Sequence, residues 1–301
     1  MRLKREVPVR LKREEERYGY ALITPSLIVV FGVIIIPIIA TLVYTFVNID
    51  PLSSHTGEFV AFGFYRKALA SKEFWADLGR TLYFTVTSTA IETVVGLLIA
   101  LLLNEDFPGV RFLRSIIIIP WAIPTVVNGS LWKLMLNGEY GVINALLVRW
   151  HLIDSYQSWL GNPKTAMLCI VIADAWKMTP LAVIFFLAAL QGIDKTRYEA
   201  AKVDGAGAFR SFLAITLPAL KPTIMVIIVM RTVEKFKAFD IFYLMTRGGP
   251  ANSTKTLMYD TYLQAFTNLN YSEAATLAYL IVLVVVLMTL VYIKLMKRGD
   301  Q

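Results

Sequence analysis

The sequence has very few residues that could hold a metal ion or form disulfide bonds. It contains one cysteine, Cys169, and two histidines, His55 and His151, among 301 residues. Cys169 lies inside an apolar stretch, and the histidines lie in expected loops without a companion at ligand spacing. A disulfide framework and a zinc cluster are therefore excluded, and we expect no metal site.

A nucleotide-binding motif is also missing. No segment has the Gly-x-x-x-x-Gly-Lys-Ser/Thr spacing of a phosphate-binding loop, and there is no low-complexity linker or second soluble domain. If ATP drives this protein, another chain must bind the ATP.

The formal net charge is +8, but the basic residues cluster beside apolar segments. We therefore expect them to set membrane topology, and we expect no nucleic-acid partner.

Long apolar stretches are what the sequence has in abundance. Hydrophobic residues make up 56% of the chain and the mean hydropathy is +0.59, which points to a membrane protein. A helix needs roughly 20 apolar residues to cross a bilayer. We expect an all-α integral membrane protein whose six transmembrane helices are residues 20–47, 81–103, 115–136, 165–190, 219–245 and 274–295.

The distribution of Lys and Arg predicts which side each loop faces. With the N-terminus inside, the inner segments carry 17 of these residues and the outer loops carry eight. This excess favours a cytoplasmic location for both termini.

The first apolar stretch is too long for a signal-peptide core, so we expect it to be retained as a transmembrane helix. We divide the chain into a basic cytoplasmic N-terminal arm, residues 1–19, and a six-span transmembrane domain, residues 20–301, with an inner loop at 191–218.

The inner loop at 191–218 carries the most specific motif. Glu199-Ala-Ala is followed after three residues by Gly205, and after nine more by Ile215-Thr-Leu-Pro218. Thr196 and Glu199 have the spacing of a capping box, which predicts a helix start there, and Gly205 predicts a stop or a sharp turn. The residues around Gly205 have small side chains, so that the backbone of a partner can approach closely.

This motif resembles the signature cytoplasmic loop of binding-protein-dependent ABC importer permeases, in which a short coupling helix docks on an ATPase subunit. Other stretches, in order and at matching topological positions, resemble the maltose- and trehalose-type sugar permeases. They are Pro37 in the first span, Tyr65–Leu82 with Phe74-Trp75, Ile119-Pro120, Ala188–Ile193, Phe239-Asp240 and Thr246–Pro250. Together they cover nearly the whole chain after the basic arm.

The resemblance implies a type I ABC importer permease fold and a translocation subunit that is not itself an enzyme. Its implied partners are a second permease, two ATPase subunits that use ATP and Mg, an extracytoplasmic sugar-binding protein and the lipid of a prokaryotic cell membrane. The chain itself would bind no cofactor. Its implied contacts with the ATPase are Glu199, Ala200, Ala201, Asp204, Gly205 and Ala206.

Two ionisable residues lie inside the fourth span. Asp174 and Lys177 follow its outer end by roughly ten to thirteen residues, near mid-depth at about 1.5 Å per residue. Such side chains are costly in hydrocarbon unless they are paired or face a polar cavity. Pro180 is predicted to kink the helix and to free a carbonyl one turn earlier. The resemblance implies that one helical face lines the sugar site, namely Asp174, Lys177, Met178 and Leu181.

The fifth span supplies a second charged face. Arg231, Glu234 and Lys235 group together about midway through the bilayer, and the resemblance places them against the substrate. Lys237 and Asp240 point to the other side, where they form either a structural pair or a contact with the partner permease.

Sugars are bound by planar polar groups and by aromatic faces beneath the ring. Asp174 and Glu234 supply the carboxylates, and Trp176 and Phe236 supply the aromatic rings. The expected substrate-binding residues are therefore Asp174, Trp176, Lys177, Met178, Leu181, Arg231, Glu234, Lys235 and Phe236.

These charges also have a structural interpretation. Arg231 with Glu234, and Asp174 with Lys177, could be internal ion pairs that only hold helices together. Glu92 in the second span has no obvious local partner, which makes it a candidate for a helix contact.

The choice of solute depends on the same spans. Residues 176–180 and 231–236 look closer to trehalose-type permeases, so we expect an α-linked disaccharide such as trehalose or maltose. Three charges in the fifth span depart from the maltose type, in which neutral side chains stand at the matching positions. A glycerol-phosphate-type solute is the alternative, because the basic residues could bind an anion. The acids Asp174 and Glu234 argue against it.

Two other functional classes fit the sequence less well. An ion-coupled secondary transporter would also hold charges in the membrane, but it usually has more spans in repeated halves and lacks an ATPase-binding motif. An intramembrane enzyme needs Ser with His, paired Asp or a His-rich metal site, and no span contains a histidine.

Overall fold

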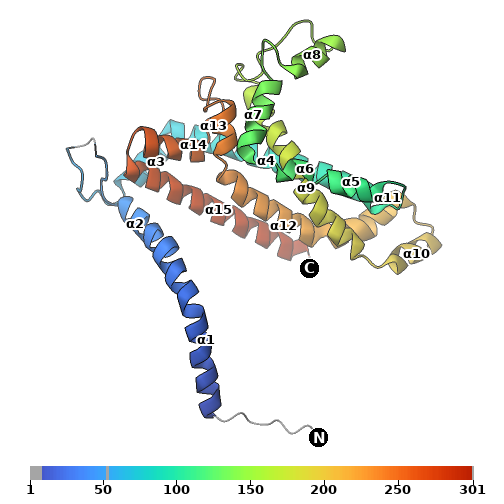
Figure 1. Cartoon of the computed structure of the whole chain (residues 1–301), viewed down its shortest axis with the longest axis horizontal. Coiled ribbons are helices and arrows are strands. Elements are labelled where there is room, and N and C mark those ends of the chain that lie inside the picture. Colours follow the sequence, from blue (N-terminus) through green and yellow to red (C-terminus); the bar gives the residue numbers. More distant parts are fainter. Residues whose placement is uncertain (1–8, 52–53, 300–301) are drawn as a thin grey trace.

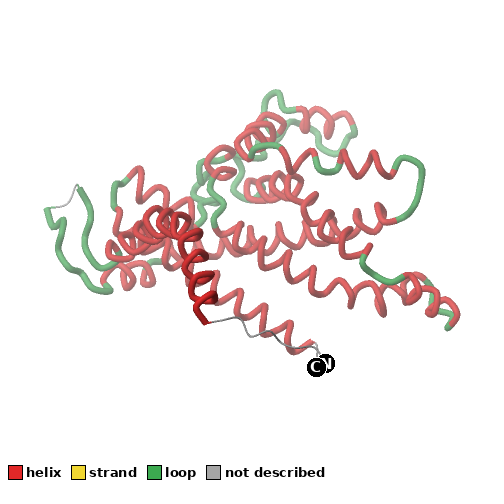
Figure 2. Tube along the Cα trace, turned by 60° about the horizontal axis from the view of Figure 1, so that its bottom comes forward, coloured by secondary structure: helices red, strands yellow, loops and turns green. Residues whose placement is uncertain are grey.

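The computed structural model describes residues 9–51 and 54–299, and in these residues all regular structure is helical apart from one bridge between Val47 and Phe59 (Figure 1, Figure 2). Five helices are long and apolar enough to cross a membrane, and a bent pair of helices makes six if it counts as one span. The predicted all-α, six-span architecture is confirmed.

The first span stands away from the rest of the molecule (Figure 1). It consists of α1 (Val9–Val30), a π-helical turn (Phe31–Ile35) and α2 (Ile36–Tyr44). Its most apolar window has none of its residues buried within the chain. The helix begins at Val9, inside the stretch that we set apart as a basic arm, and residues 1–8 of that arm lie outside the described residues.

Four long helices form the body of the molecule. They are α4 (Lys72–Asn104), α9 (Ala166–Gln191), α12 (Leu217–Phe236) and α15 (Tyr271–Gly299). The most extensive packing is between α4 and α9. A glycine permits this close approach, because a Cβ atom at Gly96 would lie only 2.7 Å from the Cβ of Ala182. These two helices therefore form a tight pair against which α12 is placed.

The third predicted span is not one straight helix. It is divided into α5 (Val110–Ile116), α6 (Ile119–Ala122) and α7 (Thr125–Met135), with a bend of 92° before α7. The break follows from Pro124, because the residue before a proline is disfavoured in helical geometry, and Ile123 has an extended ψ of 129°. The stretch of residues 115–136, predicted as one span, is therefore divided between helices that meet at this bend.

The fifth span is displaced toward the N-terminus relative to the predicted residues 219–245. Its helix begins with α11 (Ala208–Ser211) and a π-helical turn (Phe212–Thr216), continues through α12 and ends at Phe236. Asp240–Met245 forms a separate short helix, α13. The charged residues 231–235 therefore lie in the last two turns of this helix. Their depth in the bilayer stays a prediction.

Several of the shorter helices lie at the two ends of the body of the molecule (Figure 1). At one end are α10 (Lys195–Val203) and α11. At the other end are α3 (Gly63–Ala70) and α14 (Leu257–Tyr262), which a π-helical turn at Leu263–Thr267 extends. The helix α8 (Val142–Arg149) stands beyond α7, at the top of Figure 1.

Candidate functional site

A chain of buried charges joins α4, α9 and α12. Arg231 Nε donates to Oε2 of Glu92 at 2.6 Å, and Lys235 Nζ donates to Oε1 of Glu92 at 2.6 Å. Arg231 is also paired with Glu234, and Lys235 is also paired with Asp174. The charges therefore alternate in the order Glu234, Arg231, Glu92, Lys235, Asp174. We call these five residues the charged network.

The network is closed at its centre and open at one end. Glu92 has no exposed surface, and Arg231 and Lys235 are each 2% exposed. Asp174 is also buried, whereas 45% of the Glu234 side chain is exposed. Glu234 therefore carries the exposed carboxylate of the network.

Lys177 adds a third cation beside the network. It is buried, and it lies within electrostatic range of Arg231 and Glu234. The expected pair between Asp174 and Lys177 is not formed in the described structure, because Asp174 pairs with Lys235 instead, whereas the pair between Arg231 and Glu234 is present. With Lys177 included, three acids and three bases meet at this place, so their formal charges cancel.

The structure does not bring all predicted site residues together. Met178 and Leu181 are half-buried, on the same helical face of α9 as Asp174. Trp176 points to a different face and is 44% exposed. Phe236 has no exposed surface and packs in an apolar core cluster, so it offers no area to a solute here.

Three residues near this site were not predicted to belong to it. Glu92 is the centre of the network, and its position as an unpaired acid in an apolar stretch was the signal that could have indicated this. Trp132 on α7 packs edge-to-face on Trp176, with 6.1 Å between ring centroids. Asn128 donates to the carbonyl of Ala173 at 3.1 Å and so ties α7 to α9. No sequence pattern pointed to Asn128 or Trp132, because their contacts depend on the bend before α7.

Lys237 and Asp240 lie beyond the end of α12. Both side chains are exposed, and within the described chain no ion pair joins them. The expectation of an internal structural pair is therefore not met. A contact with a partner permease stays a prediction.

The second candidate surface is α10, at the opposite end of the molecule. Its N-cap is Asp194, whose carboxylate accepts a hydrogen bond from the backbone N–H of Thr196 at 2.9 Å. This hydrogen bond holds the pKa of Asp194 below its usual value. The predicted capping box was wrong, because the helix begins before Thr196, and Glu199 is left with an exposed side chain.

The C-terminal end of α10 follows the prediction for Gly205. Gly205 has a φ of +75° and donates to the carbonyl of Lys202, while Ala206 donates to the carbonyl of Ala201 at 2.8 Å. These two bonds form a Schellman motif, in which the left-handed position favours glycine. The chain therefore turns sharply into the segment that leads to the fifth span.

A side-chain contact fixes α10 to that span. The hydroxyl of Tyr198 lies 2.8 Å from the hydroxyl of Thr216 in the π-helical turn. Between α10 and the start of α12 is an open groove of about 550 Å³. Val203 and Phe209 are 88% and 76% exposed, which leaves apolar area free for a partner.

The groove residues include several of the predicted ATPase contacts. Its lining residues are Arg197, Ala200, Ala201, Asp204, Ala214, Ile215, Pro218 and Ala219. Three of these residues belong to α10, and the chain from Ala214 to Ala219 leads directly into α12. A partner that binds in the groove would therefore contact both the loop and the span.

A third polar cluster lies at the other end, where the loop before α14 meets α4. Lys255 Nζ lies 2.5 Å from Glu73, 3.0 Å from Asp260 and 3.3 Å from Asp77. Although burial opposes its charge, these hydrogen bonds to Glu73 and Asp260 raise the pKa of Lys255. The cluster fixes the loop of residues 246–256 to the start of α4.

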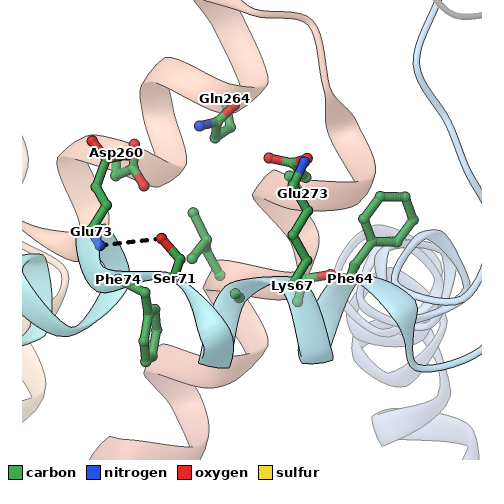
Figure 3. Close-up of a pocket in the computed structure, with 11 residues that line it drawn as sticks. Phe64, Lys67, Ser71, Glu73, Phe74, Asp260, Gln264 and Glu273 are labelled. Carbon is green, nitrogen blue, oxygen red and sulfur yellow. Dashed lines mark hydrogen bonds and ion pairs between the residues drawn. The ribbon is translucent and has the colours of Figure 1, made fainter.

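A pocket of about 270 Å³ lies next to this cluster. Figure 3 shows its polar wall, with Glu73 close to Asp260 and with Lys67 reaching toward Glu273, to which it is paired. The ring of Phe64 lies beside Lys67 and Glu273, and the ring of Phe74 lies below Glu73 and Ser71. The charged groups of this pocket are already paired with one another or with Lys255. These ion pairs join α3 to α15 and α4 to α14.

Comparison with known proteins identifies the family. The family "Binding-protein-dependent transport system inner membrane component" matches residues 92–301. The chain belongs to this family. It is 39% identical to the trehalose/maltose transport system permease protein MalF of Thermococcus litoralis, over 95% of each chain.

Other similar proteins have different solutes in their names. The chain is 34% identical to the sulfoquinovosyl glycerol transport system permease protein SmoG of Agrobacterium fabrum, over 93% of this chain and 90% of that protein. Its fold matches a crystal structure of a bacterial ABC transporter for the acidic polysaccharide alginate, with a TM-score of 0.83, 22% identity and coverage of 97% of this chain and all of that one.

Family membership settles the general role of the chain. It is a membrane-embedded permease component, which translocates a solute and is not itself an enzyme. It works with a binding protein, a second permease and ATPase subunits. Family membership therefore argues against an ion-coupled secondary transporter, which was the less favoured alternative from the sequence.

Proposed function

We propose that this chain is the permease of an ATP-driven importer for a neutral α-linked disaccharide such as trehalose or maltose. The observation that carries the proposal is the balanced set of three acids and three bases around Glu92, Asp174 and Glu234. A site with no net charge gives no advantage to an anion, and its carboxylates can accept hydrogen bonds from sugar hydroxyls. The near full-length similarity to a trehalose/maltose permease supports the same conclusion.

The substrate-contacting residues are proposed to differ in their access to the sugar. Glu234 and Lys177 meet it first, and Asp174 becomes accessible when the helices separate. Met178 and Leu181 line the same face of α9. Arg231 and Lys235 hold the acids in place. Trp176 with Trp132 is the exposed aromatic surface, whereas Phe236 supports the site from the core.

The proposed cycle couples this site to ATP at the opposite end. Both termini and α10 face the cytoplasm of a prokaryotic cell. Two ATPase subunits, which use ATP and Mg, bind Glu199, Ala200, Ala201, Asp204, Gly205 and Ala206. When they close on ATP, they draw α10 and the second permease's equivalent helix together. The Tyr198–Thr216 contact passes this movement to α12, and the network opens to receive the sugar from the extracytoplasmic binding protein.

A glycerol-phosphate-type or other anionic solute is the second candidate. Lys177 favours it, because this buried amine has no ion pair in the described structure. The similarity to a permease for sulfoquinovosyl glycerol points in the same direction.

Uptake by the complete complex tests the proposal. The permease pair, ATPase and binding protein are reconstituted in proteoliposomes, and ATP-dependent uptake is measured for trehalose, maltose and glycerol 3-phosphate. We expect uptake of at least one disaccharide and none of the phosphate. Uptake of glycerol 3-phosphate alone would reverse the assignment.

Two variants test the site itself. Glu234→Gln and Asp174→Asn should each raise the KM for the disaccharide about tenfold or more, because a charge-assisted hydrogen bond is worth about 1.5–3 kcal/mol. Asp240→Asn is the matched control, since this exposed acid lies near the end of the same span without an ion pair. An unchanged KM in both site variants would remove these residues from the site.

A further inference from the structure

Glu92 has no contact available for a solute. Its Oε2 accepts from Arg231 Nε at 2.6 Å, and its Oε1 accepts from Arg231 Nη2 at 3.3 Å and from Lys235 Nζ at 2.6 Å. The side chain has no exposed surface. Both carboxylate oxygens therefore face cations of α12, and any influence of Glu92 on transport must pass through Arg231 and Lys235.

The position of Glu92 determines how strongly these two cations hold the other acids. Arg231 is shared between Glu92 and Glu234, and Lys235 is shared between Glu92 and Asp174. Without the charge of Glu92, each cation would act on one acid alone, and that acid would be less available to hydroxyl groups. The group of six charges would also carry one net positive charge.

An unbalanced positive charge at a buried site attracts anions strongly, because the local dielectric constant is low. Arginine and lysine are the side chains that bind phosphate and carboxylate groups. The difference between a site for a neutral sugar and a site for its phosphorylated form thus depends on one carboxylate. That carboxylate comes from α4, whereas the other five groups come from α9 and α12.

We propose that Glu92 is a positioning residue that determines the charge specificity of the permease. It holds Arg231 and Lys235, keeps Asp174 and Glu234 available to hydroxyl groups, and cancels the charge that would otherwise favour an anionic solute. The inference rests on the proposed function, since it deepens the choice of a neutral substrate.

The test compares a neutral and an anionic form of one disaccharide. Equilibrium binding of radiolabelled trehalose and trehalose 6-phosphate is measured on the purified complex of both permeases and ATPase. The variants are Glu92→Gln, Glu92→Asp and the double variant Glu92→Gln/Lys235→Met. Thr89→Val is the matched control, because Thr89 is a buried, uncharged residue on the same helix.

The ratio of the two affinities is the readout that a purely structural role would not change. Glu92→Gln should lower the preference for trehalose over trehalose 6-phosphate by about tenfold or more. Glu92→Asp keeps the charge and should keep the preference. The double variant removes one cation together with the acid and should restore the preference. Thr89→Val should resemble the wild type.

Several results would overturn the inference. One is an unchanged affinity ratio in Glu92→Gln, and another is a double variant that stays as altered as the single one. If Glu92→Gln alone fails to assemble, Glu92→Ala takes its place, because it removes the same charge and should lower the preference in the same way. Failure of all three variants to assemble would make Glu92 a structural residue only. A wild-type complex that prefers trehalose 6-phosphate, or binds neither probe, would instead reject the proposed function.

Discussion

Lys235 near the end of α12 donates a 2.6 Å hydrogen bond to Glu92 on α4, across 143 positions of sequence. Both side chains are buried, so the bond forms where water cannot replace either partner. Buried ion pairs add little net stability compared with apolar packing, but removal of one partner leaves a costly unpaired charge. The relative placement of α4 and α12 therefore depends on this contact.

The first prediction concerns the stability of the network. Lys235→Met leaves Asp174 without its partner and should lower the free energy of unfolding by about 3–5 kcal/mol. Denaturant titration of the purified permease in detergent measures it. Lys237→Met is the control, since Lys237 is exposed and makes no ion pair in the described structure. Equal effects of both substitutions would show that the network is not a structural unit.

The second prediction concerns the turn after α10. Gly205→Val should impair the coupling of ATP hydrolysis to transport, because a side chain at a φ of +75° costs about 1–2 kcal/mol in backbone strain. Gly207→Val is a close control, since both positions have open space for a Cβ atom but Gly207 has a φ of −71°. ATPase activity stimulated by the loaded binding protein is the measurement. If both variants behave alike, the left-handed turn is irrelevant to coupling.

The third prediction concerns the cap of the same helix. Asp194→Ala should speed amide hydrogen exchange in the first turn of α10, whereas Thr196→Ala should not, because Asp194 is the N-cap. The pKa of Asp194 is lowered from 3.8, so its contribution is present above that pH and is lost as the pH falls through the folded-state pKa. Faster amide exchange in Thr196→Ala but not in Asp194→Ala would contradict this prediction and would support the capping box of Thr196 and Glu199.

The fourth prediction concerns Glu199. Because the structure excludes a capping role, we expect its exposed carboxylate to pair with a base on the ATPase. Glu199→Gln should therefore weaken ATPase binding about 1.5-fold to fivefold, because an exposed charge pair is worth about 0.2–1 kcal/mol. Glu105→Gln, on another exposed segment at the same side, should have no effect. Affinity is measured by titrating the ATPase onto immobilised permease, and full affinity in the Glu199 variant would reject the pair.

The fifth prediction concerns the polar cluster around Lys255. Lys255→Met leaves Glu73, Asp77 and Asp260 without their shared cation and should release the loop at residues 246–256. Limited proteolysis should then cut this loop at least several-fold faster than in the wild type. The exposed Lys72, which makes no ion pair in the described structure, gives the control Lys72→Met. Unchanged cleavage in the Lys255 variant would show that backbone contacts alone hold the loop.

The spans, the inner loop and the turn at Gly205 could be predicted from the sequence. Apolar stretches and basic loops predicted the number and order of the spans, and the motif from Glu199 to Pro218 located the surface next to α12. Gly205 was correctly placed at a sharp turn. These properties depend on residues close together in sequence, where composition, periodicity and turn preferences act directly.

Other features were decided only when the helices packed. The partner of Asp174 is Lys235 rather than the nearby Lys177, and Glu92 gains two cations from a distant helix. The bend before α7 brings Trp132 to Trp176, and the early end of α12 moves the charged residues toward one end of the helix. Sequence by itself determined a six-span permease with a coupling loop. The tertiary structure decided which charges meet, because helix rotation and crossing, not spacing along the chain, place side chains from different helices together.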